Sequence, residues 1–222
     1  MVKYGKDPKY NPDERDELDV DRQSLSLIPH DAHVLDIGCA TGFMGVYLKE
    51  TKGCHVVGLE YAEEEAKIAK KKLDGLIHGD ASDPHTINRI QEKFDVILAS
   101  AILEHLSDPA RALHLWKRLL RKNGCIIATT PNIAHWSMRL NLLRGKFDYE
   151  EYGILDKTHL RFFTLKTFRE LFEEAEYEID QMLIDPVGGG FPRLGKLLYK
   201  LFPGVFAYQM IIRARPRTYN SK

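Results

Sequence analysis

The stretch Val34-Leu35-Asp36-Ile37-Gly38-Cys39-Ala40-Thr41-Gly42 decides how this chain folds. It begins as an apolar run and ends in a turn of small residues, and apolar side chains then recur at helical spacing over 43–48. This pattern predicts a strand, a tight turn and a helix. Glycine is needed in such a turn where φ is positive or where a ligand approaches the backbone. A strand that ends in this way makes a site for a nucleotide-like ligand.

A second apolar run, 55–60, is typical of a strand and ends in the acid Glu60. Glu60 follows Gly38 by about 20 residues. At this separation along the sequence a carboxylate can accept hydrogen bonds from both hydroxyls of a bound ribose. We therefore expect an adenosine-type ligand, with Tyr61 beside Glu60 as a further contact. These two strands do not say which adenosine-type ligand binds.

The turn after the first strand separates two classes of protein that share this layout. A dinucleotide-binding turn has the pattern G-x-G-x-x-G, whereas here Ala40 takes the middle position and Phe43 the last. The run 35–42 instead resembles motif I of the class I S-adenosylmethionine-dependent methyltransferases, whose usual form is D-x-G-x-G-x-G. The resemblance implies that S-adenosyl-L-methionine is bound by Asp36, Gly38, Ala40 and Gly42.

Composition indicates an ordinary globular protein. The chain has 222 residues, of which 44% are hydrophobic and 29% charged, and we expect one domain over 1–222. Lys+Arg and Asp+Glu each total 32, so the formal net charge of +0 gives no support to a nucleic-acid partner. The three cysteines include no C-x-x-C pair, which favours buried thiols over disulfides or a zinc site. Without an apolar signal segment or membrane span, we expect a cytoplasmic protein that is not inserted in a membrane.

Strand and helix patterns alternate along the chain. An N-terminal arm and helix occupy 1–30, with the helix expected over 13–27 and stopped by Pro29. The further expected elements are helices at 43–51 and 62–73, a strand at 75–80, a strand at 94–100, a helix from 109 that Gly124 ends, and a strand at 125–131. An insert over 132–164 contains a helix at 135–145. A helix at 165–175, a strand at 178–184, a Gly188–Gly190 hinge, a helix at 194–202 and a strand at 207–214 follow.

This alternation predicts one doubly wound α/β sheet of seven mostly parallel strands with an antiparallel C-terminal hairpin. That is the Rossmann-like layout of the methyltransferases, and the resemblance covers about 13–216. The string Glu104-His105-Leu106 after the fourth strand is similar to small-molecule methyltransferases. The pattern Asp156-x-x-His159-x-x-Phe162-Phe163 resembles bacterial enzymes of glycan, lipid and secondary-metabolite pathways, which are distant relatives of the ubiquinone-biosynthesis O-methyltransferases. The resemblance implies a small-molecule acceptor that is methylated at oxygen.

The third and fourth strands supply further candidates for cofactor contacts. The resemblance implies that Asp80 accepts a hydrogen bond from the adenine amine and that the backbone of Ala81 faces a ring nitrogen. The alternative is that Asp80 only caps a turn. Ser100, at the end of the fourth strand, is expected on the cofactor side as well.

Methyl transfer requires a nucleophile held in line with the sulfonium methyl group at about 3 Å. A hydroxyl nucleophile must also lose a proton, and two histidines can titrate near neutral pH for this purpose. His105 follows the fourth strand, where the acceptor approaches, and His159 lies on the insert. The alternatives are that His105 packs under the cofactor and that His159 is tied to Asp156.

The insert also carries the candidates for substrate binding. Arg161 either holds an acidic group of the substrate or pairs with a surface acid, and His135 and Tyr152 are weaker candidates for the pocket wall. No His, Cys, Asp or Glu grouping has the spacing of metal ligands, so we expect no metal site. The apolar segment 191–203 with its basic residues either packs a helix on the core, which we favour, or contacts a lipid-linked acceptor.

Three rival functions remain open at this point. A nitrogen or carbon acceptor fits the same fold, and a protein that binds the cofactor without catalysis would act as a regulator or partner. A nicotinamide dehydrogenase is disfavoured by Phe43 and by the antiparallel C-terminal pair. The acceptor, including whether it is lipid- or glycan-linked, and the oligomeric state do not follow from the sequence.

Overall fold

The computed structural model describes residues 10–187 and 192–217. Its centre is a seven-stranded sheet in the order β3-β2-β1-β4-β5-β7-β6. The strands are β1 (His33–Ile37), β2 (His55–Glu60), β3 (Gly75–His78), β4 (Phe94–Ser100), β5 (Leu120–Pro131), β6 (Tyr177–Asp185) and β7 (Gln209–Pro216). Strands β1 to β5 pair in parallel, whereas β7 runs antiparallel to β5 and β6. The predicted mostly parallel sheet with an antiparallel C-terminal pair is confirmed.

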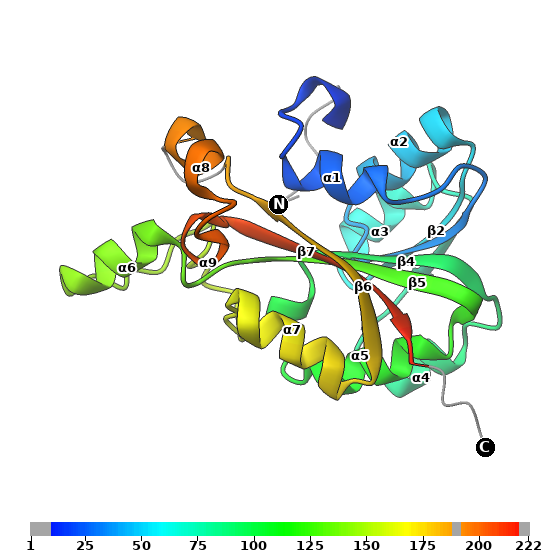
Figure 1. Ribbon diagram of the computed structural model, residues 1–222. Coiled ribbons are helices and arrows are strands. Elements are labelled where there is room, and N and C mark those ends of the chain that lie inside the picture. Colours follow the sequence, from blue (N-terminus) through cyan, green and yellow to red (C-terminus); the bar gives the residue numbers. More distant parts are fainter. Residues whose placement is uncertain (1–9, 188–191, 218–222) are drawn as a thin grey trace, which may run out of the picture.

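Helices cover both faces of this sheet (Figure 1). One face carries α1 (Val20–Ser26), α2 (Phe43–Lys52) and α3 (Glu63–Ala69), and the other carries α4 (Pro84–Asn88), α5 (Pro109–Lys117) and α7 (Leu165–Glu174). Because successive side chains of a strand point to opposite faces, Val34 packs in the core under α1 to α3 and Leu35 in the core under α4, α5 and α7. The sheet thus separates two apolar cores.

Local sequence explains most of the helix ends. Gly53 ends α2 in the left-handed conformation at φ 66°, and Thr164 starts α7 with a capping box that Thr167 completes. The helix expected over 13–27 is shorter, because the Asp19 side chain caps α1 by accepting from the N–H groups of Asp21 and Arg22. Before it lies the single 3-10 turn η1 (Pro12–Glu14).

The prediction that Gly124 ends the helix before β5 is wrong. Helix α5 already ends at Lys117, and Gly124 lies inside β5, beside the register shift between Phe94 and Val96 of β4. A Cβ at Gly124 would lie 2.9 Å from the Phe94 carbonyl oxygen. Glycine is therefore needed here for the close approach of two backbones at a bulge, not for a helix end.

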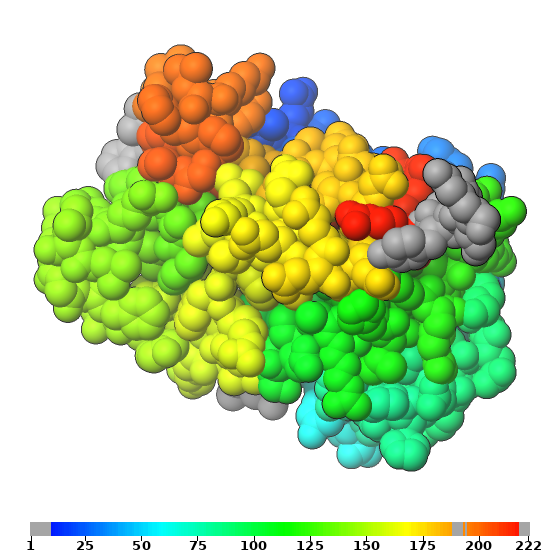
Figure 2. Space-filling view, turned by 60° about the horizontal axis from the view of Figure 1, so that its bottom comes forward, coloured from blue at the N-terminus to red at the C-terminus, as the bar shows by residue number. Residues whose placement is uncertain are grey.

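One end of the molecule is formed by α6 (Trp136–Leu143), α8 (Pro192–Leu198) and α9 (Pro203–Phe206) (Figure 1). Figure 2 shows α6 in light green and the α8 segment in orange as neighbouring parts of this end. Helix α6 has no buried residue. The Gly188–Gly190 hinge lies outside the described residues. None of the helices in the described ranges is long and apolar enough to cross a membrane.

Candidate functional site

A cavity of about 890 Å³ opens at the carboxyl ends of β1, β2 and β4. This is the edge at which an open α/β sheet binds its ligand. Of the predicted site residues, the cavity is lined by Asp36, Gly38, Ala40, Glu60, Tyr61, Asp80, Ala81, Ser100 and His105. Val20 and Asp21 of α1 add to the wall on one side, and Thr158 and Leu160 of the insert on the other.

The turn after β1 holds the cavity floor in an unusual backbone conformation. Gly38, Ala40 and Gly42 all have positive φ, at 72°, 47° and 79°. A Cβ at Gly38 would lie 2.0 Å from Ile102 Cδ1, so this turn packs directly against the loop after β4. Gly42 does not line the cavity but starts α2 in the left-handed conformation. Its predicted cofactor contact stays a prediction, and the role that the structure shows for Gly42 is to begin α2.

Glu60 is fixed by two backbone hydrogen bonds. The N–H of Ala40 donates to Oε2 and the N–H of Ala62 donates to Oε1, both at 2.8 Å. Each carboxylate oxygen has a second lone pair that remains for a ligand. Glu60 therefore ties β2 to the turn of β1 and presents a rigid pair of acceptors to the cavity.

Asp36 is a buried acid in the cavity wall. Asp36 is 3% exposed, and its Oδ2 has no hydrogen-bond partner within the described part of the chain. Burial and, to a smaller extent, the negative charge of Glu60 together raise the pKa of the Asp36 carboxyl to about 7. This position favours a positively charged group of a ligand, which would give the carboxylate the counter-charge it lacks.

The third and fourth strands place the remaining predicted residues. Oδ1 of Asp80 accepts from the N–H and the hydroxyl of Ser82, each at 2.7 Å, so Asp80 caps a turn and also lines the cavity. The Ala81 carbonyl accepts from the indole of Trp116 at 2.9 Å. The Ser100 hydroxyl lies 3.2 Å from the hydroxyl of Thr129.

The two predicted catalytic histidines lie against each other. His105 lines the cavity, and its ring centroid is 4.8 Å from that of His159. Nδ1 of His105 is 3.2 Å from the Thr158 carbonyl oxygen, and Nδ1 of His159 is 3.1 Å from the Ile154 carbonyl oxygen. Asp156 Oδ1 accepts from the Thr158 N–H at 2.8 Å, so this acid shapes the loop that carries His159.

Sequence reasoning missed Glu104 as a site residue. Glu104 is 1% exposed, and among the described residues neither of its carboxylate oxygens has a hydrogen-bond partner. Burial raises the pKa of this carboxyl to about 8, and the nearby Thr130 hydroxyl only partly opposes the shift. The feature of the sequence that could have indicated Glu104 is a charged residue directly before His105 in an otherwise apolar turn.

The expectation of no metal site rested on the spacing of residues along the sequence, and it stays a prediction; the folded chain nevertheless brings three possible ligands together. Ligand atoms of Glu104, His105 and His159 lie within 4.8 Å of one another. His159 is far from the other two in sequence, so no spacing rule joins it to them. The fold brings the insert back to β4 and creates the grouping.

The predicted substrate residues of the insert lie outside the cavity as far as the structure describes it. The Arg161 guanidinium donates to the Ser107 carbonyl oxygen, with distances of 3.1 and 2.5 Å. His135 is 1% exposed and caps α6, and burial lowers its pKa to about 4. Tyr152 is 56% exposed on the surface. Arg161 and His135 therefore hold backbone in place.

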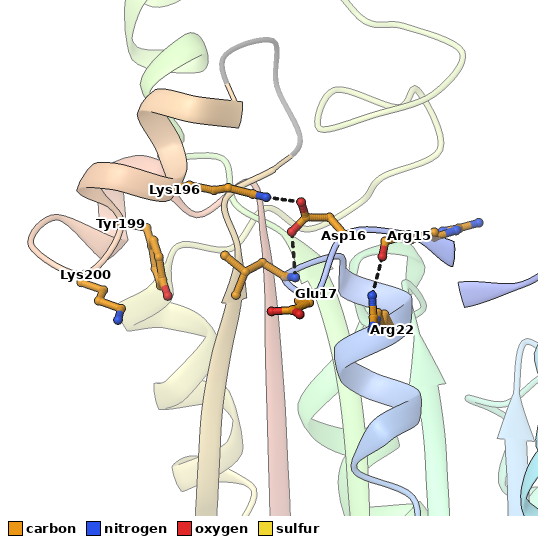
Figure 3. A pocket seen from close by; sticks show the side chains of 8 residues that line it. Arg15, Asp16, Glu17, Arg22, Lys196, Tyr199 and Lys200 are labelled. Carbon is orange, nitrogen blue, oxygen red and sulfur yellow. Dashed lines mark hydrogen bonds and ion pairs between the residues drawn. The ribbon is translucent and has the colours of Figure 1, made fainter. Parts of the chain in front are cut away.

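A second hollow, of about 530 Å³, lies between the residues before α1 and the segment around α8 (Figure 3). Lys196 forms an ion pair with Asp16 across it, and Arg22 donates to the Arg15 carbonyl oxygen at 2.7 Å. Lys200 and Tyr199 complete the wall. These contacts join the chain ahead of α1 to α8.

The chain is similar in sequence and in fold to known methyltransferases. The chain is 28% identical over 176 residues to the demethylmenaquinone methyltransferase of Listeria monocytogenes serotype 4a, covering 69% of this chain and 73% of that protein. It is 28% identical over 142 residues to the ubiquinone biosynthesis O-methyltransferase of Pasteurella multocida, covering 54% and 58%. The crystal structure of a SAM-dependent methyltransferase from Archaeoglobus fulgidus matches with a TM-score of 0.63 at 19% identity, over 87% and 90% of the two chains. The methyltransferase-domain family matches residues 11–182. The chain belongs to this family and is a class I methyltransferase that uses S-adenosyl-L-methionine.

Proposed function

We propose that this chain transfers the methyl group of S-adenosyl-L-methionine to a hydroxyl oxygen of a small, lipid-linked acceptor. The observation that carries the proposal is the position of His105. Its side chain lines the same cavity as the acids Asp36 and Glu60 and lies next to the insert. The same cavity thus contains acids that can bind the cofactor and a histidine that can accept the proton of an acceptor hydroxyl.

The residues present fit S-adenosyl-L-methionine. Glu60 offers two fixed acceptors for the ribose hydroxyls, and Asp80 keeps its second oxygen for the adenine amine. The buried and unpartnered oxygen of Asp36 suits the positive charge that the methionine part of the cofactor carries. Gly38 and Ala40 bring the backbone close to the ligand, with Tyr61, Ala81 and Ser100 completing the wall. The bound cofactor supplies an electrophilic methyl group.

Activation of the acceptor is assigned to the pair His105 and His159. The carbonyl oxygens of Thr158 and Ile154 orient the two rings, so the side chains need little reordering when the acceptor binds. Loss of the hydroxyl proton beside His105 makes the oxygen a stronger nucleophile. Leu160 adds an apolar surface that keeps water from the reacting atoms.

Two observations support a lipid-linked acceptor. The names of the curated relatives point to menaquinone and ubiquinone pathways, and apolar side chains are exposed at the end formed by α6 and α8. Leu143 and Leu197 are 85% and 73% exposed. Other exposed large apolar residues of the insert and of the α8 end are Leu142, Phe147, Tyr149, Leu160, Leu201 and Phe202. An apolar surface with lysine and arginine beside it suits an acceptor that is presented at a membrane surface.

The proposal is tested with the purified chain and labelled S-adenosyl-L-methionine. Hydroxylated aromatic acceptors are compared with and without a prenyl tail, in detergent, and the methylated atom is identified by NMR of the product. We expect O-methylation that is faster with the tail. Methylation at nitrogen or carbon would refute the oxygen assignment, and cofactor binding without any transfer would favour a regulatory protein.

A further inference from the structure

Three side chains from two segments come together beside the cavity, and one of them, His105, lines it. Glu104 and His105 belong to the 3-10 turn η2 (Leu103–His105) after β4, and His159 belongs to the insert. One carboxylate oxygen and one nitrogen from each ring lie within 4.8 Å of one another. Two imidazoles and one carboxylate are a donor set that zinc and related divalent ions prefer.

Both imidazoles are oriented by backbone carbonyls. Nδ1 of His105 faces the Thr158 carbonyl oxygen at 3.2 Å, and Nδ1 of His159 faces the Ile154 carbonyl oxygen at 3.1 Å. A carbonyl oxygen only accepts hydrogen bonds, so in each neutral ring Nδ1 carries the proton and Nε2 keeps its lone pair. Histidines that bind a metal are typically held in this way through the nitrogen that does not bind.

The carboxylate of Glu104 lacks a partner that would stabilise its charge. The residue is 1% exposed, and no hydrogen bond reaches either oxygen from the described ranges 10–187 and 192–217. Asp156, which is 2% exposed, places a second acid near Glu104. A cation between Glu104 and the two rings would neutralise this group of buried acids.

We propose that Glu104, His105 and His159 bind one divalent transition-metal ion of the Zn²⁺ type. Bonds of about 2.0–2.2 Å in a tetrahedral site require ligand atoms roughly 3.4 Å apart. The three side chains must therefore close by about an ångström on binding. A fourth position of the ion remains for a ligand from the cavity that His105 lines.

The role of the ion in the reaction rests on the proposed function. With the ion bound, His105 and His159 would serve as its ligands and no longer take up the proton. An acceptor hydroxyl on the ion would have a lowered pKa and would lose its proton to water. The oxygen lone pair then forms a bond to the methyl carbon, and the electron pair of the breaking carbon–sulfur bond stays on sulfur. The products are the methyl ether and S-adenosylhomocysteine, with no further reactant.

The test begins with protein freed of metal by a chelator. Zn²⁺ is titrated by calorimetry, and Co²⁺ by its visible absorption, which reports the ligand geometry. We expect one ion per chain. Glu104→Gln and His159→Gln should each weaken binding by at least about a hundredfold. His114→Gln, which changes an exposed histidine of α5, is the matched control and should bind like the wild type.

S-adenosyl-L-methionine calorimetry on each variant shows which proteins are folded. A Glu104→Gln protein that binds the cofactor normally but has lost the ion supports the proposal. A wild-type protein that takes up no stoichiometric ion, or variants that bind it as tightly as the wild type, would overturn it. Failure of the metal-free wild type to bind the cofactor would count against the proposed function instead.

Discussion

Replacing Glu60 by glutamine tests the ribose contact that is proposed for this carboxylate. The carboxylate accepts one backbone N–H on each oxygen, from Ala40 and Ala62, both at 2.8 Å. An amide has only one acceptor oxygen, so its NH₂ group must face one of these N–H donors. The side chain of Glu60→Gln therefore keeps one of the two backbone bonds and one of the two acceptors for the ribose.

The size of the effect follows from the lost bonds. A hydrogen bond to a charged group contributes about 1.5–3 kcal/mol, and every 1.4 kcal/mol or so is tenfold in affinity. Loss of one ribose bond should raise the Kd for S-adenosyl-L-methionine by roughly ten- to a hundredfold. The unmatched N–H at Ala40 or Ala62 should also lower the free energy of unfolding by about 1–3 kcal/mol.

Calorimetry with S-adenosyl-L-methionine and urea unfolding measure the two effects separately. Glu64→Gln is the matched control, because its side chain is 73% exposed and pairs only with Lys67 among the contacts seen in the described residues. That variant should leave both quantities nearly unchanged. A Glu60→Gln protein whose affinity stays within twofold of the wild type would refute the ribose assignment.

Three further changes test the packing around the cavity. Gly38→Ala should lower the free energy of unfolding by about 2–4 kcal/mol, because φ is 72° and the new Cβ would lie 2.0 Å from Ile102 Cδ1; adding Ile102→Val should restore part of it in urea unfolding. Trp116→Phe removes the 2.9 Å bond to the buried Ala81 carbonyl and should cost about 1–3 kcal/mol in the same assay. Asp36 has its pKa raised to about 7 in the folded state. The unfolded chain loses this proton near pH 4, so stability should fall as pH rises from about 4 to about 7. Between pH 5 and pH 8 the wild type should lose about 2–3 kcal/mol more than Asp36→Asn; equal losses would contradict the assigned pKa.

The sequence predicts the elements that depend on neighbours in the chain. The strand–turn–helix of 34–48 and the Gly53 helix end are local, because glycine conformation and apolar periodicity decide them. Glu60 was also predictable, since the layout of two parallel strands fixes where its carboxylate arrives.

The parts that could not be predicted depend on contacts between distant segments. Gly124 looks like a helix end, and only the approach of the Phe94 carbonyl shows why it stands within β5. Arg161 looks free for a substrate until the Ser107 carbonyl is placed against it. Glu104 and His159 become one cluster only when the insert folds back on β4. None of these pairings leaves a periodic signal.

The insert and the loop after β4 are joined by hydrogen bonds in which each segment supplies both donors and acceptors. The Glu104 carbonyl accepts the N–H groups of Leu160 and Arg161, at 2.8 and 3.0 Å, and the Thr158 carbonyl holds the ring of His105. A change that moves His159 must therefore also move His105 and the end of β4, which line or border the cofactor cavity. The side chains of residues 147–152 are exposed, and α6 has no buried residue. If the proposed function holds, the acceptor-facing surface can therefore vary there at lower cost than at His105 and His159, which are tied to the end of β4.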